Sequence, residues 1–190
     1  MTRYRTIVAD PPWDYRDGTG KHFGDDHRLQ PGSHGPQRTT TPSYAHMSVD
    51  QIAALPVEQI ANADATLFLW ATRRYLRVAY GIAEAWGFTP IHPLVWTKPP
   101  MSPFLGGTFP SATEYILYAK RGTPRHNGRA PADWFQLPRR GGHSTKPEAF
   151  LDLVEHVSPG PYLEMFARRA RFGWDYWGDE SLGTAKMGAA

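Results

Sequence analysis

Cysteine is absent from this chain of 190 residues. Without a thiol, the chain cannot form a disulfide, a thiolate nucleophile or a cysteine-ligated zinc or iron–sulfur site. No stretch approaches the roughly 18 consecutive apolar residues of a membrane-spanning helix. No excess of one charge is present either, because 21 basic against 18 acidic residues leave a net charge of +3. These absences predict a soluble cytoplasmic protein whose charge permits nucleic-acid binding without requiring it.

Glycine and proline are plentiful, at 18 residues each, and they are concentrated in three stretches. The stretches are residues 14–46, 98–110 and 121–142. Because connections in compact domains are usually about 4–6 residues long, we expect these stretches to be functional binding loops or disordered segments. We expect one domain over residues 1–190, with its core at about 5–180 and a C-terminal tail at 181–190.

Apolar patterning between these loops alternates between the strand type and the helix type. Residues 5–9 and 66–71 form short continuous apolar runs, which are typical of parallel strands buried on both faces. Ser48, with Gln51 three residues later, has the pattern of a capping box and begins a predicted helix over 48–60. Further helices are predicted at 73–86 and 147–157, and further strands at 88–97, 114–120, 162–166 and 173–177. This alternation predicts an α/β fold with a mostly parallel central sheet flanked by helices.

The most informative motif, Asp10-Pro11-Pro12-Trp13, directly follows the first predicted strand. In α/β sheets, ligands bind outside the carboxyl ends of the strands. The Asp10 carboxylate and the Pro11 carbonyl could accept the two N–H groups of adenine N6 and stabilise the positive charge that develops on nitrogen during methyl transfer. Consecutive prolines hold that carbonyl in place, and Trp13 offers a flat surface for an extruded base. Taken alone, the four residues are equally compatible with an Asp-Pro turn and a core tryptophan.

A longer set of segments resembles the MT-A70 family of adenine N6-methyltransferases in order and spacing. These segments are VADPPW, YAHMSVDQI, LFLWATRRYL, AWGF, VWTK, EYILYAKRG, HSTKPEAF and LEMFARRARFGWDYWGDE, from about residue 5 to residue 180. The resemblance implies a class I, Rossmann-like methyltransferase fold in permuted order, with the catalytic segment before the cofactor segment. It further implies S-adenosylmethionine as methyl donor and a catalytic loop made of Asp10, Pro11, Pro12 and Trp13.

The resemblance places most of the cofactor site in the last fifty residues. Lys146 would pair with the methionyl carboxylate, although without the resemblance it would be taken for a solvated lysine. Glu164 would form a buried ion pair with Arg168, bind the ribose or ammonium of the cofactor, or do both. The full set of expected cofactor ligands is Asp10, Ser144, Lys146, Glu164, Arg168, Arg171, Asp179 and Glu180. At the last two positions the family commonly has amides, so these acids depart from its pattern.

On the acceptor side, the resemblance places Tyr15, Tyr44, Trp96, Lys98 and Glu114 around the target adenine and its phosphate. Aromatic rings stack on bases, Lys98 can meet a phosphate, and Glu114 can orient a neighbour. Trp70 and Trp86 are assigned to the core instead. A basic surface for the nucleic-acid backbone is predicted from Arg121, Arg125, Arg129, Arg139 and Arg140. No metal site is expected, because His22, His27 and His34 lack metal-site spacing.

Two other functions stay open at this point. One is a catalytically inactive subunit that binds nucleic acid beside an active partner, but the presence of Asp10, Trp13 and Lys146 favours an enzyme. The other is methyl transfer to a different amino group, such as cytosine N4, a small molecule or a protein amide. DNA is favoured over RNA as the substrate, because a compact chain without an appended recognition domain is typical of bacterial or phage DNA-modifying members. A homodimer or a partner subunit would help one small domain to grip its substrate.

Overall fold

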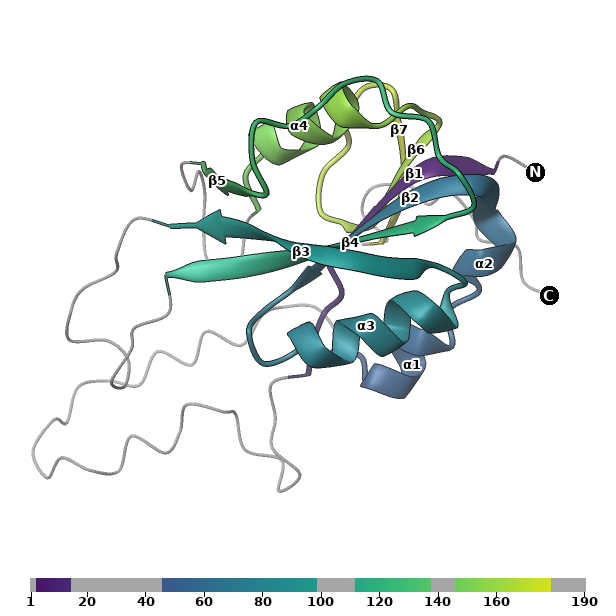
Figure 1. Ribbon diagram of the computed structural model, residues 1–190. Coiled ribbons are helices and arrows are strands. Elements are labelled where there is room, and N and C mark those ends of the chain that lie inside the picture. The colour runs from purple at the N-terminus through teal and green to yellow at the C-terminus, as the bar shows by residue number, and fades with distance from the viewer. Residues whose placement is uncertain (1–2, 15–45, 99–111, 138–145, 179–190) are drawn as a thin grey trace, which may run out of the picture.

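The computed structural model describes residues 3–14, 46–98, 112–137 and 146–178. Its strands are β1 (Tyr4–Ala9), β2 (Ala61–Ala71), β3 (Thr89–Thr97), β4 (Thr113–Arg121), β5 (Trp134–Gln136), β6 (Tyr162–Ala167) and β7 (Trp174–Gly178). Its helices are α1 (Val49–Ala53), α2 (Val57–Ile60), α3 (Leu76–Ala85) and α4 (Ala149–Val157). The strands form one sheet in the order β5-β3-β4-β2-β1-β6-β7 (Figure 1).

All described strands except β4 run in the same direction. Parallel pairs join β1 to β2 and β6, β3 to β5, and β6 to β7. β4 is antiparallel to both of its neighbours, β2 and β3. The expected mostly parallel α/β sheet is therefore confirmed. One edge of this sheet, called the carboxyl edge below, holds the carboxyl ends of the parallel strands and the amino end of β4.

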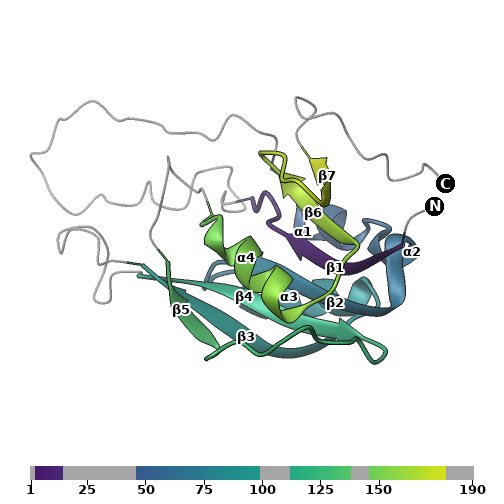
Figure 2. The ribbon, with the colours of Figure 1, turned by 90° about the horizontal axis from the view of Figure 1, so that it is seen from above.

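Helices cover both faces of the sheet, with α1 and α3 on one face and α4 on the other (Figures 1 and 2). Side chains of β2 alternate between the two cores. Leu67 and Leu69 pack in the core beneath α3, whereas Phe68 and Trp70 pack in the core beneath α4. This explains why β2 reads as a continuous apolar run. Burial of each such side chain stabilises the fold by about 1.5–3 kcal/mol.

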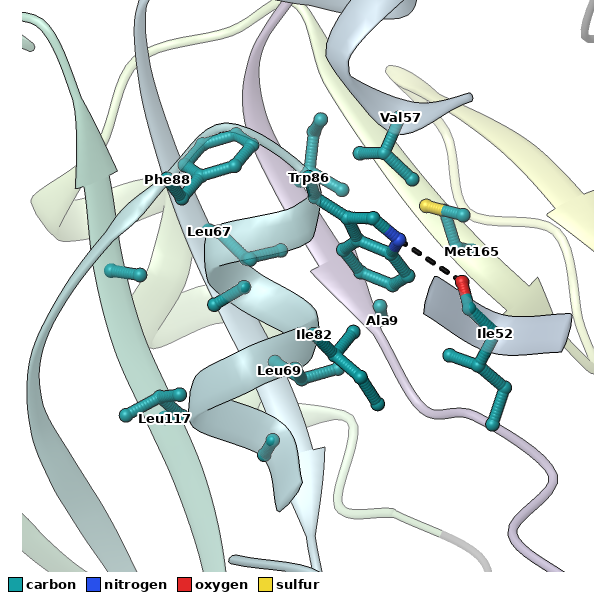
Figure 3. Packing of buried hydrophobic residues seen from close by; sticks show 14 of the residues in the cluster. Ala9, Ile52, Val57, Leu67, Leu69, Ile82, Trp86, Phe88, Leu117 and Met165 are labelled. Atoms are coloured by element: carbon teal, nitrogen blue, oxygen red, sulfur yellow. Dashed lines mark hydrogen bonds between the residues drawn. The ribbon is translucent and has the colours of Figure 1, made fainter. Parts of the chain in front are cut away.

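Trp86 joins the two helices on the α3 face. Its side chain is fully buried, and its indole N–H donates to the Ile52 carbonyl at 3.0 Å, which ties the end of α3 to α1 (Figure 3). Trp70 is also buried, at 2% exposure. The assignment of both tryptophans to the core is confirmed. A buried indole needs such a partner for its N–H, because an unmade hydrogen bond in the core is costly.

The observed elements differ from the predicted ones at several places, and one of these differences has a clear local cause. The capping box of Ser48 and Gln51 is confirmed, but the predicted helix over 48–60 is split into α1 and α2. The break falls at Pro56, which has no N–H to donate within a helix. β2 begins at Ala61 rather than at residue 66, and β5 was not predicted at all. Across the described ranges, no helix has the length and apolar composition to cross a bilayer.

Candidate active site

The Asp10-Pro11-Pro12-Trp13 loop leaves the carboxyl end of β1 with its backbone held by hydrogen bonds. The Trp13 N–H donates to the Pro11 carbonyl at 2.8 Å, and the Met47 N–H donates to the Pro12 carbonyl at 3.0 Å. Because a carbonyl oxygen has two lone pairs, Pro11 can accept one further donor. The loop is thus rigid in the way that its two prolines predicted.

Trp13 lies in the core, at 3% exposure. Its ring stacks on that of Tyr75, with centroids 4.7 Å apart and planes 14° from parallel. The indole N–H donates to the Trp70 carbonyl at 3.3 Å, and the Tyr75 hydroxyl donates to the Asp14 carbonyl. The structure therefore corrects the expectation that Trp13 offers an open face to an extruded base, because Tyr75 covers one face of a buried ring. Trp13 anchors the loop against the start of α3.

Four charged side chains of alternating sign form a row at the carboxyl edge, in the order Asp10, Lys146, Glu114 and Lys98. The Lys146 ammonium donates to both Asp10 oxygens at 2.8 Å and lies 3.4 Å from Glu114 Oε2. Lys98 forms an ion pair with Glu114 Oε1. Burial acts to raise the pKa of Glu114, but the charges of Lys146 and Lys98 outweigh it and hold that pKa below its usual value.

This charged row unites two groups of residues that the resemblance assigned separately. Asp10 and Lys146 were expected at the cofactor, and Lys98 and Glu114 at the acceptor. All four side chains are between 16% and 21% exposed, so their interactions are only partly screened by water. Lys146 contacts carboxylates of the protein itself, which the sequence did not predict.

Two buried tryptophans lie beneath the lysines of the charged row. The Lys146 ammonium is 5.1 Å from the centre of the Trp70 ring, and the Lys98 ammonium is 4.9 Å from that of Trp96. Both distances are within the range of cation–π attraction. Trp96 is 1% exposed, and its indole N–H donates to the Leu137 carbonyl at 3.1 Å. The expectation that Trp96 stacks on the target base is therefore corrected, because this ring supports Lys98 from within the core.

Glu164 lies on β6 opposite Val8 of β1, one strand away from Asp10. Burial raises the pKa of Glu164 to about 7; the charge of Arg169 opposes this shift and the charge of Asp10 adds to it. Two residues later, Phe166 has a φ of 62°, a left-handed conformation that costs a residue with a side chain about 1–3 kcal/mol. A carboxyl group of shifted pKa beside a strained backbone is typical of a binding site.

The two arginines expected at the cofactor behave differently. Arg171 donates to both Glu155 oxygens at 3.0 Å and to Asp152 at 2.6 Å. These bonds fasten the β6–β7 connection to α4, which favours a structural role for Arg171, whereas its expected role as a cofactor ligand stays a prediction. Within the described residues, Glu164 forms no ion pair with Arg168, whose side chain is exposed.

The basic segment that follows β4 lies at the opposite edge of the sheet from Asp10. Arg121 ends β4 and pairs with Glu58 at 3.2 Å. The backbone of the following segment is bonded to the carboxyl end of α4, through the Arg129 carbonyl and the Asn127 N–H. Because α4 begins near Lys146 and runs away from it, Arg121, Arg125 and Arg129 are remote from the catalytic loop. Whether they contact a nucleic-acid backbone stays a prediction.

Other expected residues lie outside the described part of the chain. They are Tyr15, Tyr44, Ser144, Asp179 and Glu180, together with Arg139, Arg140, His22, His27 and His34. Their roles stay predictions. Among the residues that the structure does describe, no three histidine, cysteine, aspartate or glutamate side chains are grouped so that they could hold a metal ion.

Sequence reasoning missed Tyr75 and one role of Trp70. Tyr75 was included in a predicted helix over 73–86, whereas it precedes α3 and packs on Trp13 of the Asp10–Trp13 loop. Its position just after the carboxyl end of a central strand was an available signal, since such positions line ligand sites. Trp70 was assigned to the core alone, but its ring also supports the Lys146 ammonium.

Several known proteins are similar in sequence to this chain over nearly its whole length. A family model described as MT-A70 matches residues 4–180. The type II methyltransferase M.MunI of a Mycoplasma species is 33% identical over 188 residues, which cover 94% of this chain and 78% of that protein. The N6-methyladenosine RNA methyltransferase MTA1 of Cryphonectria parasitica is 30% identical over 93% of this chain and 51% of its own length. The human N(6)-adenine-specific methyltransferase METTL4 is 24% identical over 94% of this chain and 38% of its own length.

The range matched by the family model contains the Asp10-Pro11-Pro12-Trp13 loop at the end of β1 and Lys146 beside it. The matched residues also contain all seven strands of the Rossmann-like sheet. The chain belongs to the MT-A70 family of methyltransferases.

Proposed function

We propose that this protein transfers the methyl group of S-adenosylmethionine to the N6 amino group of adenine in DNA. The observation that carries this proposal is the rigid loop at the carboxyl edge, with the Asp10 carboxylate held in place by Lys146. DNA is favoured over RNA because the chain matches the type II methyltransferase M.MunI at higher identity, and over a larger share of that protein, than it matches the RNA methyltransferase MTA1.

The side chains near Asp10 fit S-adenosylmethionine, which carries a carboxylate, an ammonium and a ribose. Lys146 would hold the carboxylate through a charge-assisted hydrogen bond. Glu164 would accept from the ammonium or a ribose hydroxyl, because a nearby cation or donor favours the ionised form of a carboxyl group whose pKa is about 7. When bound, the cofactor supplies a methyl group activated by its sulfonium.

On the acceptor side, Asp10 and Pro11 would bracket the target amine. Each oxygen of the Asp10 carboxylate has two lone-pair sites, so Asp10 can accept an N–H while it stays bonded to Lys146. The Pro11 carbonyl can accept the second N–H. Both acceptors become more favourable as positive charge develops on the nitrogen, and this difference between ground state and transition state is what lowers the barrier.

The target base must leave its helix before it can reach this loop. The loop lies at the edge of a rigid sheet, and N6 of a paired adenine is occupied by its Watson–Crick partner. Extrusion from a duplex costs a few kcal/mol, and it costs least for a base that is already single-stranded. Protein contacts to the strand beside the target base would offset that cost.

The test uses methyl-labelled S-adenosylmethionine with duplex DNA, single-stranded DNA and RNA of one base sequence, followed by digestion to nucleosides. We expect the label in N6-methyldeoxyadenosine. Asp10→Asn should lower the rate by on the order of 10²–10³-fold, because the amide is a weaker acceptor for an amine that gains positive charge. Asp50→Asn, on exposed α1 surface, is the matched control and should react as the wild type does.

The nucleoside that carries the label decides between acceptors. Label in N4-methyldeoxycytidine would make the assigned base wrong, and label in RNA alone would make the assigned nucleic acid wrong. If Asp10→Asn reacts within a few fold of the wild type while folding normally, the catalytic role of Asp10 is wrong.

A further inference from the structure

Two exposed arginines, Arg73 and Arg77, mark the beginning of α3 and are called the arginine pair below. Between them lies Tyr75, which stacks on Trp13 of the catalytic loop at 4.7 Å and bonds to the Asp14 carbonyl. The arginine pair is therefore within one helical turn of a residue that contacts the loop. Figure 1 shows α3 beginning at the edge where β1 and β2 end.

The position of the arginine pair is unfavourable for the helix itself. The amino end of a helix carries partial positive charge and favours acidic side chains, yet the first turn of α3 has none. Arg77 is in the first turn of α3 and Arg73 is in the turn that precedes the helix, so both positive charges lie near that amino end. In the described part of the chain, neither guanidinium has a carboxylate partner. Both side chains are exposed, and no carboxylate of the described residues offsets their charges.

The same arrangement favours an anion from outside. A helix terminus and two guanidinium groups all attract negative charge, and arginine forms paired hydrogen bonds with phosphate. The neighbouring Arg74 guanidinium lies 5.7 Å from the centre of the Tyr75 ring, so a third positive charge is close to the same surface. The ligand that this surface fits is therefore a chain of phosphates that passes close to the catalytic loop.

We propose that the arginine pair binds the phosphodiester backbone beside the target base. This inference rests on the proposed function. A DNA strand whose base enters the Asp10–Trp13 loop would pass the start of α3, because Tyr75 packs on Trp13 there. The arginine pair differs from the surface expected from the sequence, of which Arg125 and Arg129 lie at the far edge of the sheet from Asp10. Arg73 and Arg77 bind the backbone of the DNA strand, while Asp10 and Pro11 act on the extruded base.

The experiment compares two double variants that remove the same charge. Arg73→Ala/Arg77→Ala removes the arginine pair, and Arg125→Ala/Arg129→Ala, also exposed, is the matched control. Binding of a fluorescent duplex DNA of about 20 base pairs is measured by anisotropy from 50 to 200 mM salt. Each lost phosphate contact should reduce the slope of log affinity against log salt by about 0.9. Wild-type affinity should therefore fall about 12-fold more over this range than that of the arginine-pair variant.

Methyl transfer on the same DNA gives a second readout. The arginine-pair variant should show a higher KM for DNA, an unchanged kcat and an unchanged affinity for S-adenosylmethionine, whereas the control should match the wild type. If the arginine-pair variant has the same salt slope as the wild type, and the wild type methylates DNA normally, this inference is wrong and the proposed function still holds. A wild-type protein that neither binds nor methylates nucleic acid overturns both.

Discussion

Replacing Glu164 by glutamine tests the electrostatics of the cofactor side of the site. Glu164 lies between the fully buried residues Leu163 and Met165 on a central strand. Burial raises its pKa from 4.5 to about 7, because the charged form loses water that the protein does not fully replace. Glutamine has nearly the shape of the protonated side chain and cannot ionise. The substitution therefore removes the cost of ionisation and little else.

The sign of the effect follows from proton binding. The folded protein binds this proton more tightly than the unfolded chain does, so stability is highest at low pH and falls as the pH rises from about 4.5 to 7. The total cost above pH 7 corresponds to about 3 kcal/mol, and most of it develops between pH 5 and pH 8. Relative to the wild type, Glu164→Gln should thus gain about 2–3 kcal/mol in its free energy of unfolding between pH 5 and pH 8.

Urea unfolding followed by tryptophan fluorescence at pH 5, 6, 7 and 8 measures this difference. Glu84→Gln, on the exposed side of α3, is the control and should show a constant difference from the wild type. A constant difference for Glu164→Gln as well would refute the reasoning, since it would mean that Glu164 ionises equally easily in the folded and unfolded states. If Glu164 binds the cofactor, the same variant should lose affinity for S-adenosylmethionine most clearly above pH 7.

Two further substitutions test which residues bind the cofactor and which only stabilise the fold. Lys146→Met should weaken S-adenosylmethionine binding by about 1.5–3 kcal/mol, measured by calorimetry, because it removes a partly buried charge-assisted donor. Lys120→Met, on exposed surface of β4, is its control, and an unchanged affinity in Lys146→Met would contradict the assignment. Arg171→Ala should lower the free energy of unfolding by about 1–3 kcal/mol through its lost bonds to α4. Its affinity for the cofactor should stay within twofold, and a large loss would restore Arg171 as a ligand.

Much of this protein could be predicted from the sequence because the signals are local. The apolar run at 66–71 lies within β2, since a strand buried on both faces must be apolar at every position. The Ser48 capping box depends only on residues three apart along the chain. The Asp10-Pro11-Pro12-Trp13 loop was predicted at the end of a central strand for the same reason, because prolines end the strand wherever it lies in the sheet.

Tertiary structure alone decided the features that depend on distant partners. The direction of β4 depends on its pairing with β2 and β3, which no pattern within the strand encodes. Burial of Trp13 and Trp96 depends on which rings and helices meet them, and an aromatic residue after a strand suits a base or a core equally well. Arg171 finds Glu155, sixteen residues away, only because α4 packs beside β6 and β7. A charged side chain pairs with whatever the fold brings within reach, so its role is settled by packing that acts across the whole chain.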